Sequence, residues 1–223
     1  MTAKLSPLLP WLAVLTALLA ITGDLLGLRP LVIVCKPATT LLIIAWAWPR
    51  GADAPAVRRW VRAGLVLSLA GDVFLMWPQQ GFLPGLVSFL LAHLAYIAAF
   101  TRKVRLAARP APFAVYALVA VALLWQLWSG VPEPLRGPVL AYVACLATMA
   151  AQAAVLWLAA RGGAAEALAR NAALGGVLFM TSDALLAFNK FSAPVPLAGL
   201  WILLTYWLAQ GLIAASLRVP ANR

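Results

Sequence analysis

The chain consists of long apolar stretches separated by short breaks that are rich in proline, glycine and arginine. A helix needs about 20 apolar residues to cross the hydrocarbon core of a bilayer, and eight stretches approach that length. None shows the alternating apolar and polar residues of a membrane β-barrel. The spans are predicted at Pro7–Leu26, Pro30–Trp48, Arg59–Trp77, Phe82–Phe100, Pro112–Trp128, Pro138–Leu158, Asn171–Phe188 and Pro196–Leu217. The expected fold is all-α, a polytopic membrane bundle of eight transmembrane helices that forms one domain over residues 1–223.

The composition agrees with this pattern. Of the 223 residues, 65% are hydrophobic and 10% are charged, whereas a soluble domain has about 45–50% and 25%. An ordinary water-soluble core and a disordered chain are both excluded. Cys35 and Cys145 lie inside apolar stretches and are expected to be buried thiols, with no disulfide or metal-binding role.

The net charge of +11 is distributed unevenly between the two predicted sides. Thirteen of the 17 basic residues fall on the side that carries both termini, three fall on the other side, and Lys36 lies inside a span. The positive-inside rule therefore predicts that both termini are cytoplasmic. The abundance of alanine and arginine indicates a bacterial protein, and hence the inner membrane. No nucleic-acid partner is expected, because the basic residues are confined to loops between spans.

Three ionisable side chains lie within the predicted spans. Lys36, Asp72 and Asp183 are each six positions from a boundary on the non-cytoplasmic side, which is roughly 9 Å of helix rise. Their common depth predicts a shared polar cavity, because charged groups inside a membrane usually face the bundle interior. Two alternatives are that Lys36 extends to the interface and that the aspartates only hydrogen-bond to neighbouring helices.

Other polar residues in the spans are less specific. His93 lies mid-span and is either a packed hydrogen-bonding residue or a catalytic one. Tyr206 and Gln210, one turn apart, share a helix face and either line the cavity or hold helices together. A metal site is not expected, since the single histidine and the carboxylates show no ligand spacing.

A weak internal repeat relates the third and seventh spans. Aligning Asp72 with Asp183 also pairs Gly64 with Gly175. Spans of equal parity run in the same direction, so the alignment predicts a parallel repeat of four plus four helices.

Five short motifs occur in order along nearly the whole chain, from about Asp24 to Ser216. They are Lys36-Pro37, Gly71-Asp72, Ala92-His93 with Tyr96, Ser182-Asp183, and Tyr206 with Ala209-Gln210. In these motifs the chain resembles the lysoplasmalogenase family of YhhN-like membrane proteins. The resemblance implies a hydrolase that cleaves the vinyl ether of a lysoplasmalogen to a fatty aldehyde and a glycerophospho-ethanolamine or -choline. The substrate would be a lysophospholipid within the membrane, and no cofactor is required.

Vinyl ether hydrolysis begins with protonation of the β-carbon, which leaves an oxocarbenium ion for water to capture. Two carboxyl groups near one ammonium are expected to divide into one neutral acid and one ionised aspartate, as this reaction needs. The residues alone do not distinguish the two; our hypothesis makes Asp183 the acid and Asp72 the base. Lys36 either tunes the pair or contacts the head-group phosphate. The residues expected to orient substrate and water are His93, Tyr206, Gln210, Ser182 and Asn189.

Two other functions fit the same residues. A small proton-coupled transporter of an amphiphilic or anionic solute could use Lys36, Asp72 and Asp183 as an ion relay. A non-catalytic lipid-binding protein would need the aspartates only for stability. The sequence does not indicate an oligomeric state, the leaflet from which substrate enters or a preferred head group.

Overall fold

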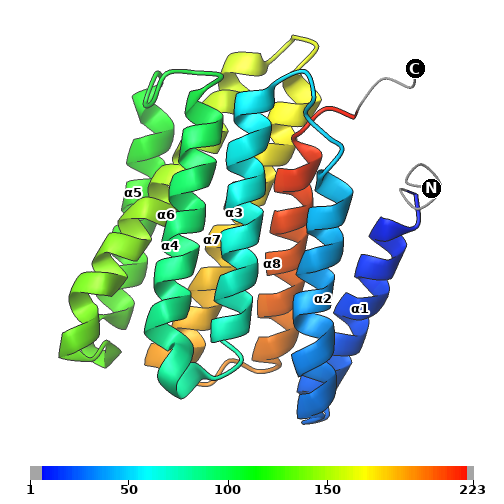
Figure 1. The fold of residues 1–223 in the computed structure, drawn as a ribbon. Helices are drawn as coiled ribbons and strands as arrows, with labels where there is room; N and C mark the ends of the chain where they lie inside the picture. The colour runs from blue at the N-terminus through cyan, green and yellow to red at the C-terminus, as the bar shows by residue number, and fades with distance from the viewer. Residues whose placement is uncertain (1–6, 220–223) are drawn as a thin grey trace.

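The computed structural model describes residues 7–219, and the secondary structure of this part of the chain consists of helices without a β-strand (Figure 1). Proline stands at the first or second helical position of six of the eight α-helices there, where its missing N–H costs nothing. The elements are α1 (Leu9–Leu25), α2 (Arg29–Ala47), α3 (Pro55–Phe74), α4 (Pro78–Thr101), α5 (Pro110–Leu127), the 3-10 helix η1 (Trp128–Gly130), α6 (Glu133–Ala160), α7 (Glu166–Phe191) and α8 (Ala198–Ala215).

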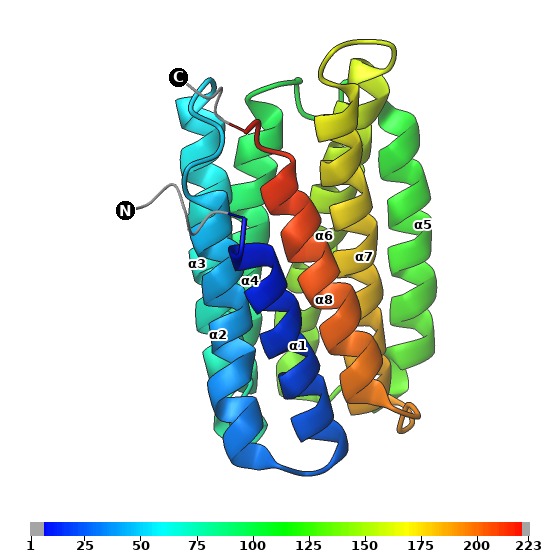
Figure 2. The same cartoon turned by 90° about the vertical axis from the view of Figure 1, so that its right-hand side faces the viewer.

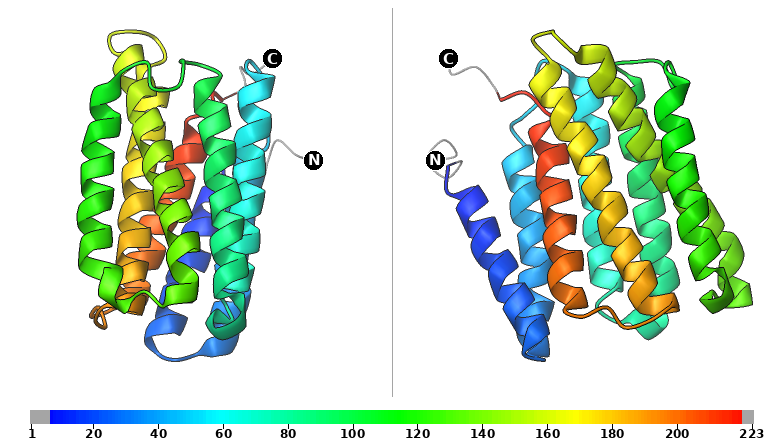
Figure 3. Two further views of the ribbon diagram at one scale, coloured as in Figure 1. Left: turned by 90° about the vertical axis from the view of Figure 1, so that its left-hand side faces the viewer. Right: turned by 180° about the vertical axis from the view of Figure 1, so that it is seen from behind.

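Seven of these helices form a closed series of neighbours. Helix α1 contacts α2, then α2 contacts α3, α3 contacts α4, α4 contacts α6, α6 contacts α7, α7 contacts α8, and α8 returns to α1 and α2 (Figures 2 and 3). Helix α5 lies outside this series against α6, and only Ala120 and Leu127 of it are buried. Helices far apart in the sequence, such as α2 and α8, therefore meet around a common interior.

The outer surface of the bundle is apolar, as a lipid-facing surface must be. Trp11 is 73% exposed, Leu118 is 72% exposed and Trp125 is 85% exposed. Six helices are long and apolar enough to cross a membrane. The two others are α1, which has 17 residues, and α3, whose first turns carry three arginines. The chain is an integral membrane bundle.

Several helix ends differ from the predicted spans. Helices α6 and α7 each begin five residues before the predicted starts at Pro138 and Asn171. Helix α3 covers Pro55–Phe74 instead of Arg59–Trp77. The prediction followed apolar stretches alone, whereas the helices continue through polar residues at the membrane surface. The shift of α3 places Asp72 in its last turn.

Close approach of consecutive helices depends on glycine in two corresponding places. A Cβ atom on Gly64 of α3 would overlap the ring of Tyr96 on α4. A Cβ atom on Gly175 of α7 would overlap the side chain of Ile213 on α8. Small residues allow membrane helices to pack with their backbones close together, so each glycine permits a close contact with the next helix.

Candidate active site

A cavity of about 470 Å³ lies inside the bundle, near the end formed by the loops after α1, α3 and α7. Lys36 of α2, Asp72 of α3 and Asp183 of α7 all line it. The shared cavity that their common depth predicts is therefore confirmed. Because the three groups come from separate helices, the cavity depends on the packing of both halves of the chain.

Asp72 is 2% exposed and is held by two hydroxyl groups. Thr40 Oγ1 donates to its Oδ2 at 2.6 Å, and Tyr206 Oη donates to the same atom at 2.8 Å. Trp207 Nε1 donates to Thr40 Oγ1 at 3.2 Å. Since an indole nitrogen can only donate, the Thr40 oxygen accepts that bond and its own hydrogen is directed to Asp72. Among residues 7–219, the hydrogen bonds that Asp72 accepts through its side chain both end on Oδ2.

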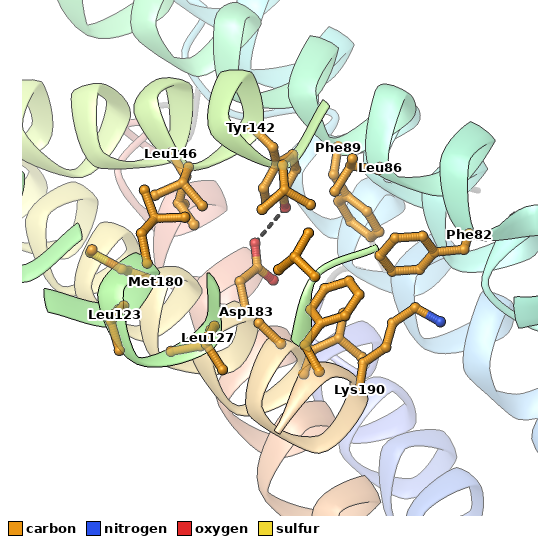
Figure 4. A pocket seen from close by; sticks show the side chains of 18 of the residues that line it. Phe82, Leu86, Phe89, Leu123, Leu127, Tyr142, Leu146, Met180, Asp183 and Lys190 are labelled. Atoms are coloured by element: carbon orange, nitrogen blue, oxygen red, sulfur yellow. Dashed lines mark hydrogen bonds between the residues drawn. The ribbon is translucent and has the colours of Figure 1, made fainter. Parts of the chain in front are cut away.

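Asp183 has a separate set of partners. The Tyr142 hydroxyl on α6 donates to Asp183 Oδ2 in a short hydrogen bond (Figure 4). His93 Nε2 on α4 is 3.1 Å from the Tyr142 oxygen and 3.8 Å from Asp183 Oδ2. His93 is fully buried and does not line the cavity. It contacts the Tyr142 hydroxyl, which in turn donates to the Asp183 carboxylate.

Lys36 is half-buried on the cavity wall, one helical turn before Thr40. The contacts within 4 Å between basic and acidic side chains of the described residues, His93 with Asp183 and Arg218 with Asp53, do not include it. Its ammonium group is therefore positioned on a wall of the cavity without a carboxylate within 4 Å in the described part of the chain.

The predicted substrate-binding residues divide into two groups. Tyr206, Ser182 and Asn189 line the cavity. The Ser182 hydroxyl donates to the Ile202 carbonyl at 3.0 Å, and Asn189 Oδ1 accepts from the Val195 N–H at 3.0 Å, so both also hold the backbone.

Gln210 lies away from the cavity wall. It is fully buried, and its Oε1 accepts a hydrogen bond from the Tyr96 hydroxyl at 2.7 Å. This bond joins α8 to α4. Of the two roles considered for Gln210, the bond agrees with holding helices together. Tyr206, on the same helix face, lines the cavity.

A narrow apolar slot continues from the cavity between α4, α5, α6 and α7 (Figure 4). Cavity and slot share six lining residues, and among them Asp183 is the only carboxylate. The slot encloses about 80 Å³, and apart from Asp183, Tyr142 and Lys190 its lining is entirely hydrophobic. Asp183 thus stands where a polar compartment meets an apolar one.

Four residues of this region were missed by sequence reasoning: Thr40, Tyr142, Asp24 and Lys190. Thr40 could have been found, because it follows Lys36 by one turn on the same face of α2. Tyr142 has no such signal, since its partner is on another helix. Asp24 lines the cavity, with its carboxylate against Gly199 in the first turn of α8.

Residues 7–219 contain no group of three or more His, Cys, Asp or Glu side chains that could hold a metal ion.

Comparison with known proteins gives consistent results. A family model described as the YhhN family matches residues 31–217. Lysoplasmalogenase TMEM86B of Sus scrofa is 34% identical over 187 residues, which cover 82% of this chain and 72% of that protein. Lysoplasmalogenase TMEM86A of Homo sapiens is 37% identical over 155 residues, which cover 69% of this chain and 62% of that protein.

A bacterial relative extends the similarity. The lysoplasmalogenase of Mycobacterium tuberculosis is 29% identical over 201 residues, which cover 83% of this chain and 70% of that protein. No solved structure matches the chain.

Proposed function

This chain belongs to the YhhN family, which the sequence resemblance indicated, and from that membership we propose that it hydrolyses the vinyl ether bond of a lysoplasmalogen-type lysophospholipid. The products would be a fatty aldehyde and a glycerophospho-ethanolamine or -choline. The relatives named as lysoplasmalogenases support this reaction.

The observation that carries the proposal is the placement of two carboxyl groups on one cavity inside a lipid-facing bundle. Hydrolysis of a vinyl ether needs one group that protonates carbon and one that deprotonates water. Asp72 and Asp183 can fill these two roles at once. A lipid substrate can reach them because the protein is itself embedded in the membrane.

The reaction balances with these two groups and one water molecule. The acid transfers its proton to the β-carbon as the C=C electron pair forms the new C–H bond, which leaves an oxocarbenium ion. Water adds to that ion, and the base takes a proton from the water. The resulting hemiacetal breaks its C–O bond to glycerol, its hydroxyl becomes the aldehyde carbonyl, and the glycerol oxygen receives a proton. One water molecule is consumed in total.

We assign the base to Asp72 and the acid to Asp183. Two hydroxyl donors converge on Asp72 and Lys36 stands on the same cavity, and such donors stabilise an ionised carboxylate. Asp183 accepts one hydroxyl donor, Tyr142, where Asp72 accepts two, and it borders the apolar slot, whose surroundings favour the neutral carboxylic acid. The ionised Asp72 would also stabilise the oxocarbenium ion.

The other cavity residues would hold the substrate. Lys36 is available for the head-group phosphate because no carboxylate of the described residues pairs with it. Tyr206, Ser182 and Asn189 line the same cavity and would orient substrate and water. His93 and Gln210 lie behind it and would act as positioning residues.

We also propose the finer points of topology. Helices α1 and α3 cross the bilayer with the other six, and both termini are cytoplasmic in a bacterial inner membrane. The loops after α2, α4 and α6 lie at the same end of the bundle as the start of α1 and the end of α8 (Figure 1). Arg50, Arg102 and Arg161 are at this end. The four-plus-four repeat is supported by the aligned glycines Gly64 and Gly175, each of which lies against the next helix of the chain.

The test is release of fatty aldehyde from an alkenyl lysophosphoethanolamine by the purified protein in detergent. Matched lysolipids with a saturated alkyl ether or an acyl ester in place of the vinyl ether serve as controls. We expect aldehyde from the vinyl ether alone. Absence of aldehyde with a folded protein, for both the ethanolamine and the choline head group, would contradict the proposal.

A further inference from the structure

We propose that the apolar slot between α4, α5, α6 and α7 binds the hydrocarbon chain of the substrate and sets its preferred length. This inference rests on the proposed function in one respect, the identity of the substrate as a single-chain lysolipid. The slot would hold the chain with its methyl end towards Leu123, Leu146 and Met180.

The position of Asp183 is the first argument. The slot meets the polar cavity at this residue, which lines both. In an alkenyl lysolipid the reactive bond joins the polar head to the apolar chain. A molecule with its head beside Lys36 and its chain in the slot therefore places that bond at the carboxyl group of Asp183.

The shape and lining of the slot are the second argument. Leu123, Leu146 and Met180 lie on one side of Asp183, whereas Phe82 and Lys190 lie on the other (Figure 4). Nearly all of the lining is aliphatic or aromatic. Such a lining suits a hydrocarbon chain and offers few hydrogen-bonding partners to a polar head group. The slot encloses about 80 Å³, which is room for part of one unbranched chain and too little for a second chain beside it.

A second apolar groove, between α1, α2 and α8, does not offer this geometry. It is larger, at about 400 Å³, but it shares no lining residue with the polar cavity and contains no carboxyl group. A chain bound there would not place its first carbons beside either aspartate. This groove, lined in part by Leu208, supplies a matched control.

The experiment narrows the slot at its far end and compares substrates of one head group and increasing alkenyl chain length. Leu123→Phe is suitable because α5 is the least enclosed helix and tolerates a larger side chain. In Leu123→Phe we expect kcat/KM for the longest substrate to fall about tenfold more than kcat/KM for the shortest. Loss of contact with a few methylenes in an apolar pocket typically has an effect of this size. Leu123→Ala should retain the wild-type kcat/KM for the longest substrate. Leu208→Phe, in the other groove, should leave the chain-length profile unchanged.

A binding measurement separates this proposal from the proposed reaction. A non-hydrolysable alkyl ether lysolipid with a photoreactive diazirine near its methyl end is cross-linked to the wild-type protein, and the labelled peptides are identified. Labels at Leu123, Leu146 or Met180 support the slot even if the protein releases no aldehyde. Labels confined to the groove of α1, α2 and α8, or an equal loss of kcat/KM at every chain length in Leu123→Phe, would overturn the proposal even if hydrolysis is found.

Discussion

Asp72 and Asp183 come from different halves of the chain and line one cavity, yet each carboxylate is held by a different tyrosine. Tyr206 of α8 donates to Asp72, and Tyr142 of α6 donates to Asp183. Two carboxyl groups with separate partners can keep different protonation states beside a single substrate. This relationship is what an acid–base pair requires, and it makes the roles of the two residues separately testable.

The first prediction concerns the carboxyl groups themselves. Asp72→Asn and Asp183→Asn should each lower the rate of aldehyde release by about 10²-fold to 10⁴-fold, the usual contribution of a general acid or base. The amide keeps the size of the side chain but can neither donate nor accept the required proton. Initial rates in detergent at saturating substrate measure the effect.

Asp53→Asn is the matched control for both variants. Asp53 lies in the loop after α2, where it pairs with Arg218 at 3.6 Å, at the opposite end of the bundle from the cavity. Surface ion pairs contribute little to stability, so this variant should keep full activity. Wild-type rates in both cavity variants, with intact folding by circular dichroism, would refute the assignment of Asp72 and Asp183.

The second prediction concerns the proton that is transferred to the β-carbon of the substrate. In D₂O, protonation of the β-carbon by an exchanged Asp183 should place one deuterium on the carbon next to the aldehyde group. Rapid reduction of the product to the alcohol prevents later exchange, and mass spectrometry counts the deuterium. An aldehyde without deuterium would exclude β-carbon protonation, whichever residue supplies the proton. Aldehyde incubated in D₂O without enzyme and reduced after the same time is the control.

The third prediction separates two roles for Lys36. If its ammonium contacts the phosphate, Lys36→Gln should raise KM for an alkenyl lysophospholipid about tenfold or more, because hydrogen bonds to charged groups contribute about 1.5–3 kcal/mol. Alkenyl glycerol, which lacks the phosphate, should be unaffected. If Lys36 instead tunes the aspartates, kcat should fall for both substrates. Lys103→Gln, at the opposite end of the bundle, is the control.

The cavity was predictable because depth in a membrane can be counted along the chain. Helix rise and the turn signals placed Lys36, Asp72 and Asp183 at one level, and the physical cost of buried charge predicted that they face inward. The structure agrees, since all three line one cavity. The same counting cannot give the azimuth of each helix, which decides whether a residue at the right depth faces the cavity.

Gln210 and Tyr142 show this limit. Gln210 shares a helix face with Tyr206, but only Tyr206 lines the cavity, because α4 approaches closely enough for Tyr96 to bind the amide. Tyr142 was missed because its role depends on α6 lying beside α7, a neighbour relation that no local pattern encodes. The apolar slot escaped prediction for the same reason, since its walls come from four helices.

The fourth prediction concerns the packing of α3 against α4. Gly64→Ala adds a methyl group that overlaps the ring of Tyr96, and overpacking of this kind costs typically about 1–3 kcal/mol. Gly211→Ala in α8 meets nothing within 4 Å and should be neutral or stabilising, since alanine favours a helix. Thermal unfolding in detergent should therefore give a lower Tm for Gly64→Ala alone. Equal Tm values would contradict the close contact between Gly64 of α3 and Tyr96 of α4.

The last prediction tests Tyr142 as a positioning residue for Asp183. Tyr142→Phe keeps the ring against His93 but removes the hydroxyl that donates to Asp183. A lost hydrogen bond to a charged or ionisable group costs about 1.5–3 kcal/mol, so kcat/KM should fall about tenfold or more. The pH dependence of kcat should also change, because the carboxyl group that donates the proton has lost its hydrogen-bonding partner. Tyr116→Phe, on the peripheral helix α5, should alter neither quantity. A purely structural role for Tyr142 would lower Tm and leave the pH profile in place, which distinguishes the two explanations.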